Sequence, residues 1–151
     1  MIKKSNIGMI LVLIIVTFSS ALYFYNVFYY ITPYEAIQKA SDAADSGTTI
    51  SGVFKLKIQA IGSEDQTSYL NSELDYRDQR NLTIVIPSKL KKELINKYKL
   101  NLNQIFMGKN ILIDGEAMRV KIIISVQGQK TSKYYYQTHV RVYNIDQIQI
   151  K

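Results

Sequence analysis

The carboxylates and guanidiniums between residues 73 and 80 are the group of side chains best suited to acid–base or metal chemistry. Glu73, Asp75 and Asp78 alternate there with Arg77 and Arg80. Paired carboxylates can bind a hard cation or act as general acid and base. Acids that alternate with arginines between two strands are more typical of ion pairs, because each carboxylate has a cation close by. We therefore interpret this cluster as ion pairs that fix a hairpin.

His139 is the single histidine of the chain, which contains no cysteine. Without cysteine there are no disulfides, thiolate nucleophiles or Cys-bound zinc. His139 stands between Thr138 and Val140 in a predicted strand, and we expect it at the surface or in a hairpin. No P-loop, G-x-S-x-G or two-histidine metal motif is present. The sequence therefore predicts no catalytic residue, no cofactor, no metal and no enzymatic activity.

Basic side chains outnumber acidic ones by 19 to 12, which gives a net charge of +7. Lysines interleaved with tyrosines can bind single-stranded nucleic acid or anionic lipid, although a lysine-rich helix is most often a solvated surface. The tentative ligand-binding face consists of Tyr69, Tyr76, Arg77, Arg80, Lys55 and Lys57.

Residues 1–31 have the composition of a membrane anchor. No charged side chain lies between Lys4 and Glu35, and residues 8–28 are mostly apolar. As a helix this stretch reaches about 31 Å, which matches a hydrocarbon core of about 30 Å. Two lysines near the N-terminus predict a single-pass inner-membrane protein with its N-terminus inside and its domain in the periplasm. The alternative is a signal peptide cleaved after Ala21, which would release the protein into the periplasm.

Residues 32–47 predict a short helix between the anchor and the domain. Thr32 can cap this helix, Pro33 suits its first position, and Glu35 completes a capping box. Gly47 can end it, because glycine tolerates the left-handed conformation. We expect this helix to be a stalk or lid that packs on the domain.

Residues 48–151 form the predicted domain, in which the apolar period changes from helical to two. Strands are predicted over residues 48–60, 67–71, 81–86, 110–125 and 134–143, with turns at 62–65 and 127–130 and a helix capped by Ser88. This order is that of an OB-fold, a five-stranded Greek-key barrel with a helix between strands three and four. Gly52 and Gly115 lie in mid-strand, where a small barrel needs a backbone that can bend sharply.

Several short motifs resemble a group of small, mostly uncharacterised bacterial extracytoplasmic OB-fold proteins. The motifs are YLN at 69–71, DYR at 75–77, NLT at 81–83, GK at 108–109 with Gly115, and VYNIDQI at 142–148. The resemblance covers about residues 48–151 and implies the OB-fold, but it is nearly silent on activity. The segment 120–133 is longer than the hairpin usual in that group.

The plan of one inward-anchored helix followed by an outward OB-fold is also loosely similar to the haem chaperone of cytochrome c maturation. That family attaches haem through a histidine near the end of its barrel. This chain departs from the pattern, because His139 lies inside a predicted strand. A carrier of haem or of another ligand is therefore the least favoured alternative.

The sequence as a whole favours a membrane-anchored, extracytoplasmic binding or assembly module whose partner is a protein of the cell envelope. The main alternative is an oligonucleotide-binding accessory of DNA transfer or uptake, which would account for the basic charge and the tyrosines. The ligand, the partner and the oligomeric state are open at this point.

Overall fold

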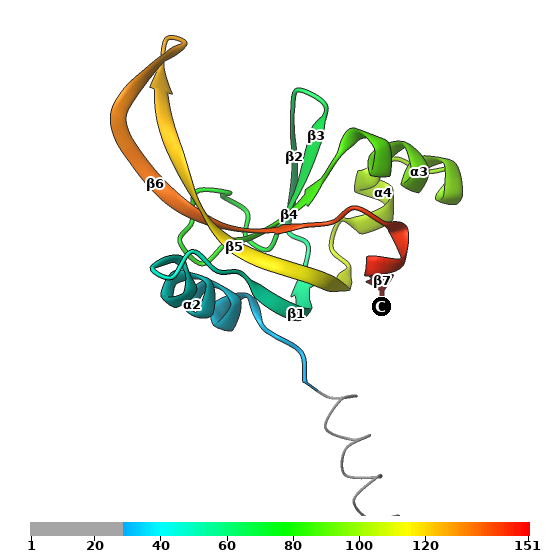
Figure 1. Cartoon of the computed structure of the whole chain (residues 1–151). Coiled ribbons are helices and arrows are strands. Elements are labelled where there is room, and N and C mark those ends of the chain that lie inside the picture. Colours follow the sequence, from blue (N-terminus) through cyan, green and yellow to red (C-terminus); the bar gives the residue numbers. More distant parts are fainter. Residues whose placement is uncertain (1–28) are drawn as a thin grey trace, which may run out of the picture.

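The computed structural model describes residues 29–151 (Figure 1). The predicted membrane span lies almost wholly outside the described residues, as does the alternative cleavage site after Ala21. Within residues 29–151 no helix combines the length and the apolar character that a membrane crossing needs.

Within residues 29–151 seven strands form one mixed sheet, so the expected predominance of β-structure with a few helices is confirmed. The strands are β1 (Ile50–Lys57), β2 (Ala60–Glu64), β3 (Thr67–Asn71), β4 (Leu82–Ile86), β5 (Asn110–Val126), β6 (Gln129–Arg141) and β7 (Ile148–Ile150). Their hydrogen-bonded order is β1-β5-β6-β4-β3-β2, and β7 pairs with β5. The pairing of β4 with β6 is parallel, whereas the other five pairings are antiparallel.

The first predicted strand, 48–60, contains β1 and ends where the chain changes its partner and continues as β2. β1 pairs with β5, and β2 pairs with β3. Between them the N–H of Ile58 donates to the C=O of Lys109 at 2.9 Å, and the N–H of Gln59 donates to the C=O of Asn71 at 2.9 Å. Residues 50–64 therefore supply both end strands of this order, β1 and β2.

The predicted turn at residues 62–65 is wrong in its position. Gly62 and Ser63 belong to β2, where Gly62 pairs with Tyr69 of β3. The chain reverses at Asp65, which has a φ of 51°, a left-handed conformation that aspartate tolerates better than most residues. Cross-strand pairing overrides the preference of this polar, glycine-containing run for a turn.

β5 and β6 form a long hairpin that extends well beyond the rest of the sheet (Figure 1). Its turn residues Gln127 and Gly128 have φ values of 52° and 78°, as tight hairpin turns require, which confirms the predicted turn at 127–130. β1 pairs with β5 only as far as Ala117, and beyond that point β5 pairs with β6 alone. The last predicted strand, 134–143, begins and ends too late, because the polar residues at the start of β6 carry no apolar alternation.

The short helix α2 (Pro33–Ala44) confirms the prediction for residues 32–47. Both halves of the capping box form: Glu35 N–H donates to Thr32 Oγ1 at 3.3 Å, and Thr32 N–H donates to a Glu35 carboxylate oxygen at 2.8 Å. The buried face of the helix consists of Ala36, Ala40 and Ala43. These small side chains let α2 pack closely on β1 and β5, as expected of a helix that rests on the domain.

The helix between β4 and β5 is confirmed as α3 (Ser88–Tyr98), with Leu90 and Leu94 on its buried face. Its N-cap is Pro87 and makes no side-chain hydrogen bond, so the predicted cap by Ser88 is wrong. The short helix α4 (Leu102–Phe106), the 3₁₀ turn η1 (Ile145–Gln147) and β7 are not anticipated by the sequence. Each is too short to show a clear apolar period.

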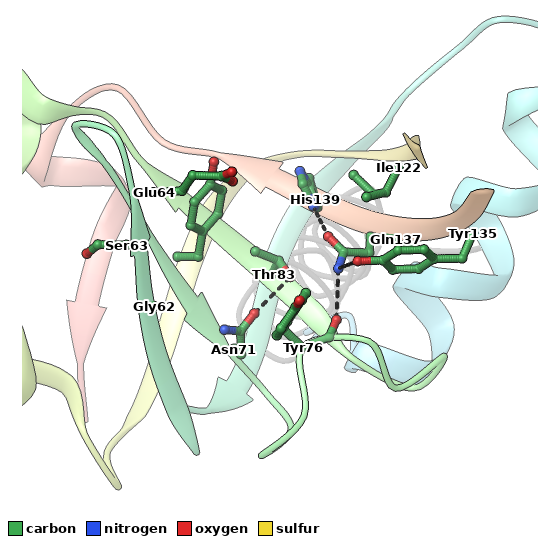
Figure 2. A pocket seen from close by; sticks show the side chains of 11 residues that line it. Gly62, Ser63, Glu64, Asn71, Tyr76, Thr83, Ile122, Tyr135, Gln137 and His139 are labelled. Atoms are coloured by element: carbon green, nitrogen blue, oxygen red, sulfur yellow. Dashed lines mark hydrogen bonds between the residues drawn. The ribbon is translucent and has the colours of Figure 1, made fainter. Parts of the chain in front are cut away.

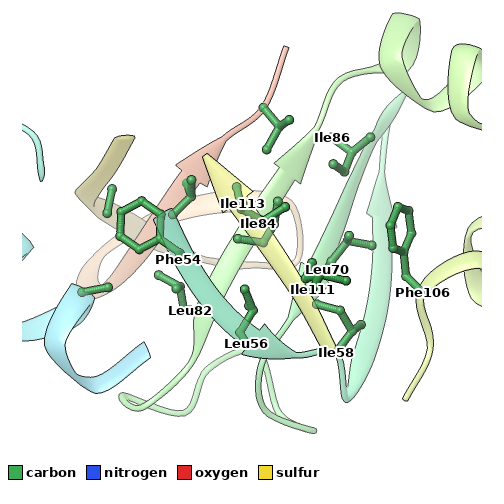
Figure 3. Close-up of a cluster of buried hydrophobic side chains, with 14 of the residues drawn as sticks. Phe54, Leu56, Ile58, Leu70, Leu82, Ile84, Ile86, Phe106, Ile111 and Ile113 are labelled. Carbon is green, nitrogen blue, oxygen red and sulfur yellow. The ribbon is translucent and has the colours of Figure 1, made fainter. Parts of the chain in front are cut away.

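The core is formed mainly by apolar side chains of the strands, which are joined by residues of α2, α3 and α4 (Figure 3). Phe54 of β1 and Phe106 of α4 are its largest fully buried members. β5 contributes Ile111, Ile113 and Ala117 to the core, and all three are buried. In β1 the buried Phe54 and Leu56 alternate with exposed lysines, as the period of two of an extended chain requires, whereas β4 is buried along almost its whole length.

Close packing accounts for the two mid-strand glycines, which face each other across β1 and β5. A Cβ on Gly52 would lie 2.5 Å from Cδ1 of Ile31, and a Cβ on Gly115 would lie 3.0 Å from Cγ1 of Val140. Ile31 itself is held by the backbone of β1, since its N–H donates to Val53 O at 2.8 Å. The absence of a side chain at residue 52 therefore lets the segment before α2 lie against the strand.

Candidate functional site

A groove of about 450 Å³ lies between the β2–β3 hairpin and the β5–β6 hairpin (Figure 2). β4 and β6 supply part of its floor, and the connection between β3 and β4 supplies one wall. The groove is lined by Gly62, Ser63, Glu64, Tyr69, Asn71, Tyr76, Thr83, Ile122, Tyr135, Gln137 and His139. Residues from separate segments of the chain therefore meet in one concave surface.

Three tyrosines form the aromatic part of the lining. Tyr69 comes from β3, Tyr76 from the connection that follows it, and Tyr135 from β6. Burial raises the pKa of Tyr69, and the nearby carboxylates of Glu64 and Asp65 raise it further. Burial also raises the pKa of Tyr135. Both phenols therefore keep their protons at neutral pH and present a hydroxyl beside an aromatic face.

The floor carries a buried polar cluster. The side-chain oxygen of Asn71 accepts hydrogen bonds from Asn81 Nδ2 and from Thr83 Oγ1, each at 3.0 Å. Asn81 Nδ2 also donates to the C=O of Tyr76 at 3.2 Å, so the cluster holds the loop that carries this tyrosine. Buried polar groups that are fully paired fix one arrangement of their surroundings.

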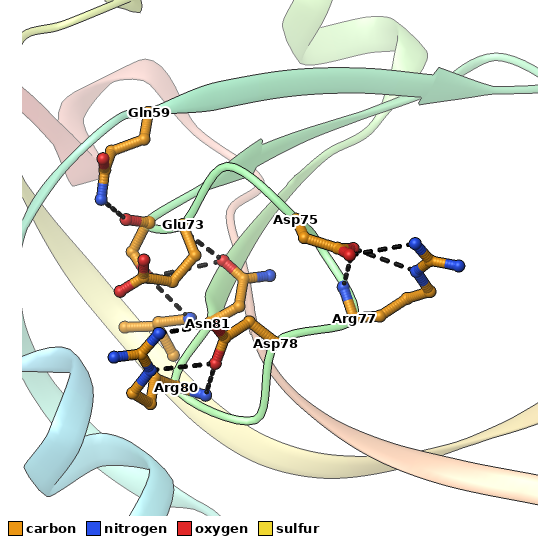
Figure 4. Close-up of polar contacts among 9 residues, drawn as sticks. Gln59, Glu73, Asp75, Arg77, Asp78, Arg80 and Asn81 are labelled. Carbon is orange, nitrogen blue, oxygen red and sulfur yellow. Dashed lines mark hydrogen bonds and ion pairs between the residues drawn. The ribbon is translucent and has the colours of Figure 1, made fainter.

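Asn81 connects this floor to the loop over residues 72–81 (Figure 4). Its Oδ1 accepts from the N–H of Glu73 at 3.1 Å and from Ser72 Oγ at 3.4 Å. Ser72 Oγ in turn accepts from the N–H of Leu82 at 2.8 Å. The amide of Asn81 thus holds both ends of the loop, a role that the acid–arginine pattern in the sequence does not reveal.

His139 lies in β6 of the β5–β6 hairpin, one of the two expected positions, but it is buried, with 8% of its surface exposed, so the alternative of a surface position is wrong. Its Nε2 lies 2.7 Å from Gln137 Oε1. Gln137 Nε2 donates to the C=O of Tyr76 at 2.9 Å and to the hydroxyl of Tyr135 at 3.3 Å, which identifies Oε1 as the acceptor and Nε2 of His139 as the donor. The Nδ1 atom is then the hydrogen-bond acceptor of the ring.

The imidazole of His139 is neutral at physiological pH. Burial, and then the charge of Arg141, lower its pKa from 6.5 to about 4. Its ring centroid lies 6.4 Å from that of Tyr69 across the floor of the groove. A neutral imidazole beside amides and tyrosines offers hydrogen bonds without adding positive charge.

The structure does not bring the six residues of the tentative ligand-binding face together in one place. Tyr69 and Tyr76 line the groove, and the guanidinium of Arg77 lies 5.6 Å from the ring centroid of Tyr76. Arg80 is paired with Asp78. Lys55 and Lys57 lie apart from the groove on β1, where the Lys55 ammonium lies 5.8 Å from the ring centroid of Tyr30.

The acidic cluster forms the ion pairs that the sequence predicts (Figure 4). Asp75 pairs with Arg77 at 3.0 Å, and Asp78 pairs with Arg80 at 2.8 Å. The side-chain hydrogen bond from Arg80 lowers the pKa of Asp78 to about 2. Among residues 29–151 no group of three or more acidic or histidine side chains is placed to hold a metal ion.

The remaining groove residues share a signal that could have located them. Asn71, Thr83 and His139 are buried polar side chains, each next in sequence to a core residue (Leu70, Ile84 and Val140) and therefore on the opposite face of its strand. A buried polar side chain needs a partner, so polar residues on the second face of an inner strand indicate either a polar network or a site. The sequence alone does not show that these three strands are neighbours.

The groove combines aromatic faces, hydroxyl groups, amides and a neutral imidazole, which is the chemistry of recognition by stacking and hydrogen bonding. Glu64 and Arg77 place one charge of each sign beside it. No protein-family model and no curated protein matches this chain.

Proposed function

We propose that this protein is a membrane-anchored, extracytoplasmic OB-fold module that binds a segment of a partner protein of the cell envelope and does not catalyse a reaction. The observation that carries the proposal is the groove between the β2–β3 and β5–β6 hairpins, with its three tyrosines over a polar floor. Fold, location and partner are supported by different features of the chain.

The order of strand pairing supports the OB-fold. If β1 and β2 are counted as one bent strand, the chain has five principal strands with α3 between the third and the fourth. The first strand then pairs with the second and the fourth, and the third pairs in parallel with the fifth. This order of pairing supports the five-stranded Greek-key barrel, the fold that the resemblance to small extracytoplasmic proteins implies.

The leader supports the location. Its uncharged, apolar length suits a bilayer, and the lysines before it favour a cytoplasmic N-terminus. An inner-membrane anchor would hold the groove outside the cytoplasm, where envelope proteins are the available partners.

The lining of the groove supports a polypeptide as the occupant. Tyrosine is enriched at protein interfaces because it combines a large apolar area with one hydroxyl and few rotatable bonds. The amides of Asn71 and Gln137 and the ring of His139 are uncharged groups of the kind that bind peptide N–H and C=O groups. The paired polar floor holds these groups in place before binding.

Site-specific photo-crosslinking in native membranes tests this proposal. A photo-reactive phenylalanine analogue in place of Tyr76 or Tyr135 should form an adduct of one discrete mass with the partner. The same analogue in place of Tyr98, which is 38% exposed on α3, is the matched control and should form none. Adducts from position 98 alone, or no adduct from the two groove positions, would refute a protein partner in the groove.

A single-stranded oligonucleotide is the second candidate occupant, favoured by the three groove tyrosines and the net charge of +7. The carboxylates of Glu64 and Asp65 beside Tyr69 oppose it, because they repel phosphates. Binding of fluorescent oligomers in a salt series separates the two candidates. Affinity that falls steeply with salt favours the oligonucleotide, whereas no binding at low salt excludes it.

A further inference from the structure

The distal half of the β5–β6 hairpin carries positive charge with no opposing acid. Beyond Ala117 the hairpin, residues 118–140, contains four cationic side chains and no aspartate or glutamate. All four are exposed: Arg119, Lys121, Lys130 and Lys133. Lys121, Lys130 and Lys133 lie beyond the pairing of the hairpin with β1 and β4, on a ribbon that projects from the rest of the sheet, and Arg119 lies at the start of this ribbon (Figure 1).

Two of these cations are held by tyrosines on the face of the ribbon opposite the groove. Tyr135 lines the groove, so its neighbours Tyr134 and Tyr136 point to the other side. The guanidinium of Arg119 lies 3.9 Å from the ring centroid of Tyr136, and the ammonium of Lys121 lies 4.0 Å from that of Tyr134. The charges are therefore ordered before any partner arrives.

Exposed aliphatic side chains lie among these cations. Ile123, Ile124 and Val126 are 45%, 38% and 57% exposed. Ile123 pairs directly with Tyr134, which is 50% exposed, across the two strands. Cations, aliphatic side chains and tyrosines thus share one end of a ribbon.

We propose that this end of the β5–β6 hairpin docks on a membrane surface rich in anionic lipid. Lysine and arginine are attracted to anionic headgroups, tyrosine favours the membrane interface, and aliphatic side chains enter the outermost acyl region. Nucleic acid accounts for less of the surface, because the cations already cover faces of Tyr134 and Tyr136 that would stack on bases. Bound nucleic acid would also leave the exposed aliphatic side chains in contact with water.

The direction of the hairpin identifies which membrane it would reach, and this step rests on the proposed anchor. Phe54 forms a bridge with Ile31 and pairs with Ile113 of β5, thirteen residues before Val126. At about 3.3 Å per residue the tip lies up to about 43 Å along the strand from that point. Figure 1 shows the tip on the side of the domain opposite the entry of the chain. The hairpin therefore contacts an apposed membrane, not the one that holds residues 1–28.

A vesicle-tethering experiment tests the proposal with the full chain. The protein is reconstituted into phosphatidylcholine donor vesicles and mixed with labelled acceptors of phosphatidylcholine alone or with added phosphatidylglycerol. We expect co-flotation of donors with the anionic acceptors only, and its loss in about 1 M salt, where the Debye length is about 3 Å. Equal capture of both acceptors would overturn the proposal.

Matched variants separate the hairpin from the general positive charge. Replacing Lys121, Lys130 and Lys133 by Gln should reduce tethering at least about fivefold, since each lysine near an anionic surface adds to the attraction. Replacing Lys89, Lys92 and Lys97 of α3 by Gln removes the same charge and should leave tethering nearly unchanged. Equal losses in the two variants would overturn the role of the hairpin.

Two further measurements complete the test. Ile123→Ser with Val126→Ser should also weaken tethering, whereas Leu74→Ser, at an exposed loop position, should not.

Binding of single-stranded oligomers that is lost in the hairpin lysine variant, without vesicle capture, would identify a nucleic-acid surface instead. If the chain does not remain in donor vesicles, the anchor is refuted, and sedimentation of the same chain with anionic acceptors alone then decides the lipid contact.

Discussion

At the scale of single residues, His139 links the floor of the groove to the stability of the fold. Its ring is buried, donates to Gln137, and through Gln137 is connected to Tyr76 and Tyr135. A charged imidazole at this position would face the cost of burial and the repulsion of Arg141. The groove is therefore arranged around a neutral ring.

This arrangement predicts a pH dependence of unfolding. The folded pKa of about 4 lies below the ordinary value of 6.5, so between these values the unfolded chain binds more protons and the folded state loses stability as the pH falls. The loss attributable to His139 is up to about 3 kcal/mol, from about 1.4 kcal/mol per pKa unit. Urea unfolding at pH 7 and near pH 4.5, followed by tyrosine fluorescence, measures it.

The variant His139→Gln isolates this contribution from that of the carboxylates. Glutamine does not titrate, so the free energy of unfolding of the variant should change less over the same pH interval than that of the unaltered protein. An identical pH dependence in the two proteins would show that the ring is not held neutral by its surroundings.

At the scale of elements, the segment that precedes α2 can contact β1 because Gly52 has no side chain. Ile31 is 3% exposed and lies over Gly52 in the structure. Its backbone N–H and C=O form hydrogen bonds with β1, and the next residue, Thr32, caps α2. The position of α2 on the sheet therefore follows from a close approach at residue 52.

Gly52→Val should destabilise the protein by about 1–3 kcal/mol, the usual cost of overpacking a buried site. The new side chain would have to displace Ile31 within the core. Gly62→Val is the matched control: a Cβ on that strand glycine would meet no atom within 4 Å, and the change should stay within about 0.5 kcal/mol.

A double-mutant cycle checks the cause of this effect. In the Ile31→Ala background the cost of Gly52→Val should shrink, because the space that valine needs is then free. Strictly additive free energies of unfolding, measured by thermal denaturation, would mean that valine clashes elsewhere.

At the scale of the whole molecule, the direction of the chain in the membrane decides what the groove can meet. Lys3, Lys4 and the uncharged stretch after them predict a domain outside the cytoplasm. The groove and the hairpin tip would then both face the envelope. Reversal of this direction would place both in the cytoplasm with other partners.

Reporter fusions after Lys151 test the direction. Alkaline phosphatase at this position should be active, because it folds in the oxidising periplasm, whereas a fluorescent protein that requires the cytoplasm should be dark. The opposite pair of results would reverse the predicted orientation. The mass of the purified protein distinguishes the anchor from cleavage after Ala21.

Strong local signals made a large part of the fold predictable. The capping box of Thr32 and Glu35, the tight turn at Gln127 and Gly128, and the ion pair of Asp75 with Arg77 all form as predicted. Each joins residues that are at most three positions apart, so short-range sterics and hydrogen bonding determine it. The candidate site was only partly predictable, because two of the six proposed residues line the groove.

By itself the sequence determined the alternation of strands and helix, the excess of basic charge and the apolar leader, because composition and period are properties of neighbouring residues. Tertiary structure alone decided that β4 lies beside β6, which brings Thr83 opposite His139. A strand has two faces, and which one becomes the floor of a groove depends on the elements that cover the other. Those elements come from distant parts of the chain, so the polar floor and the burial of His139 follow from long-range pairing.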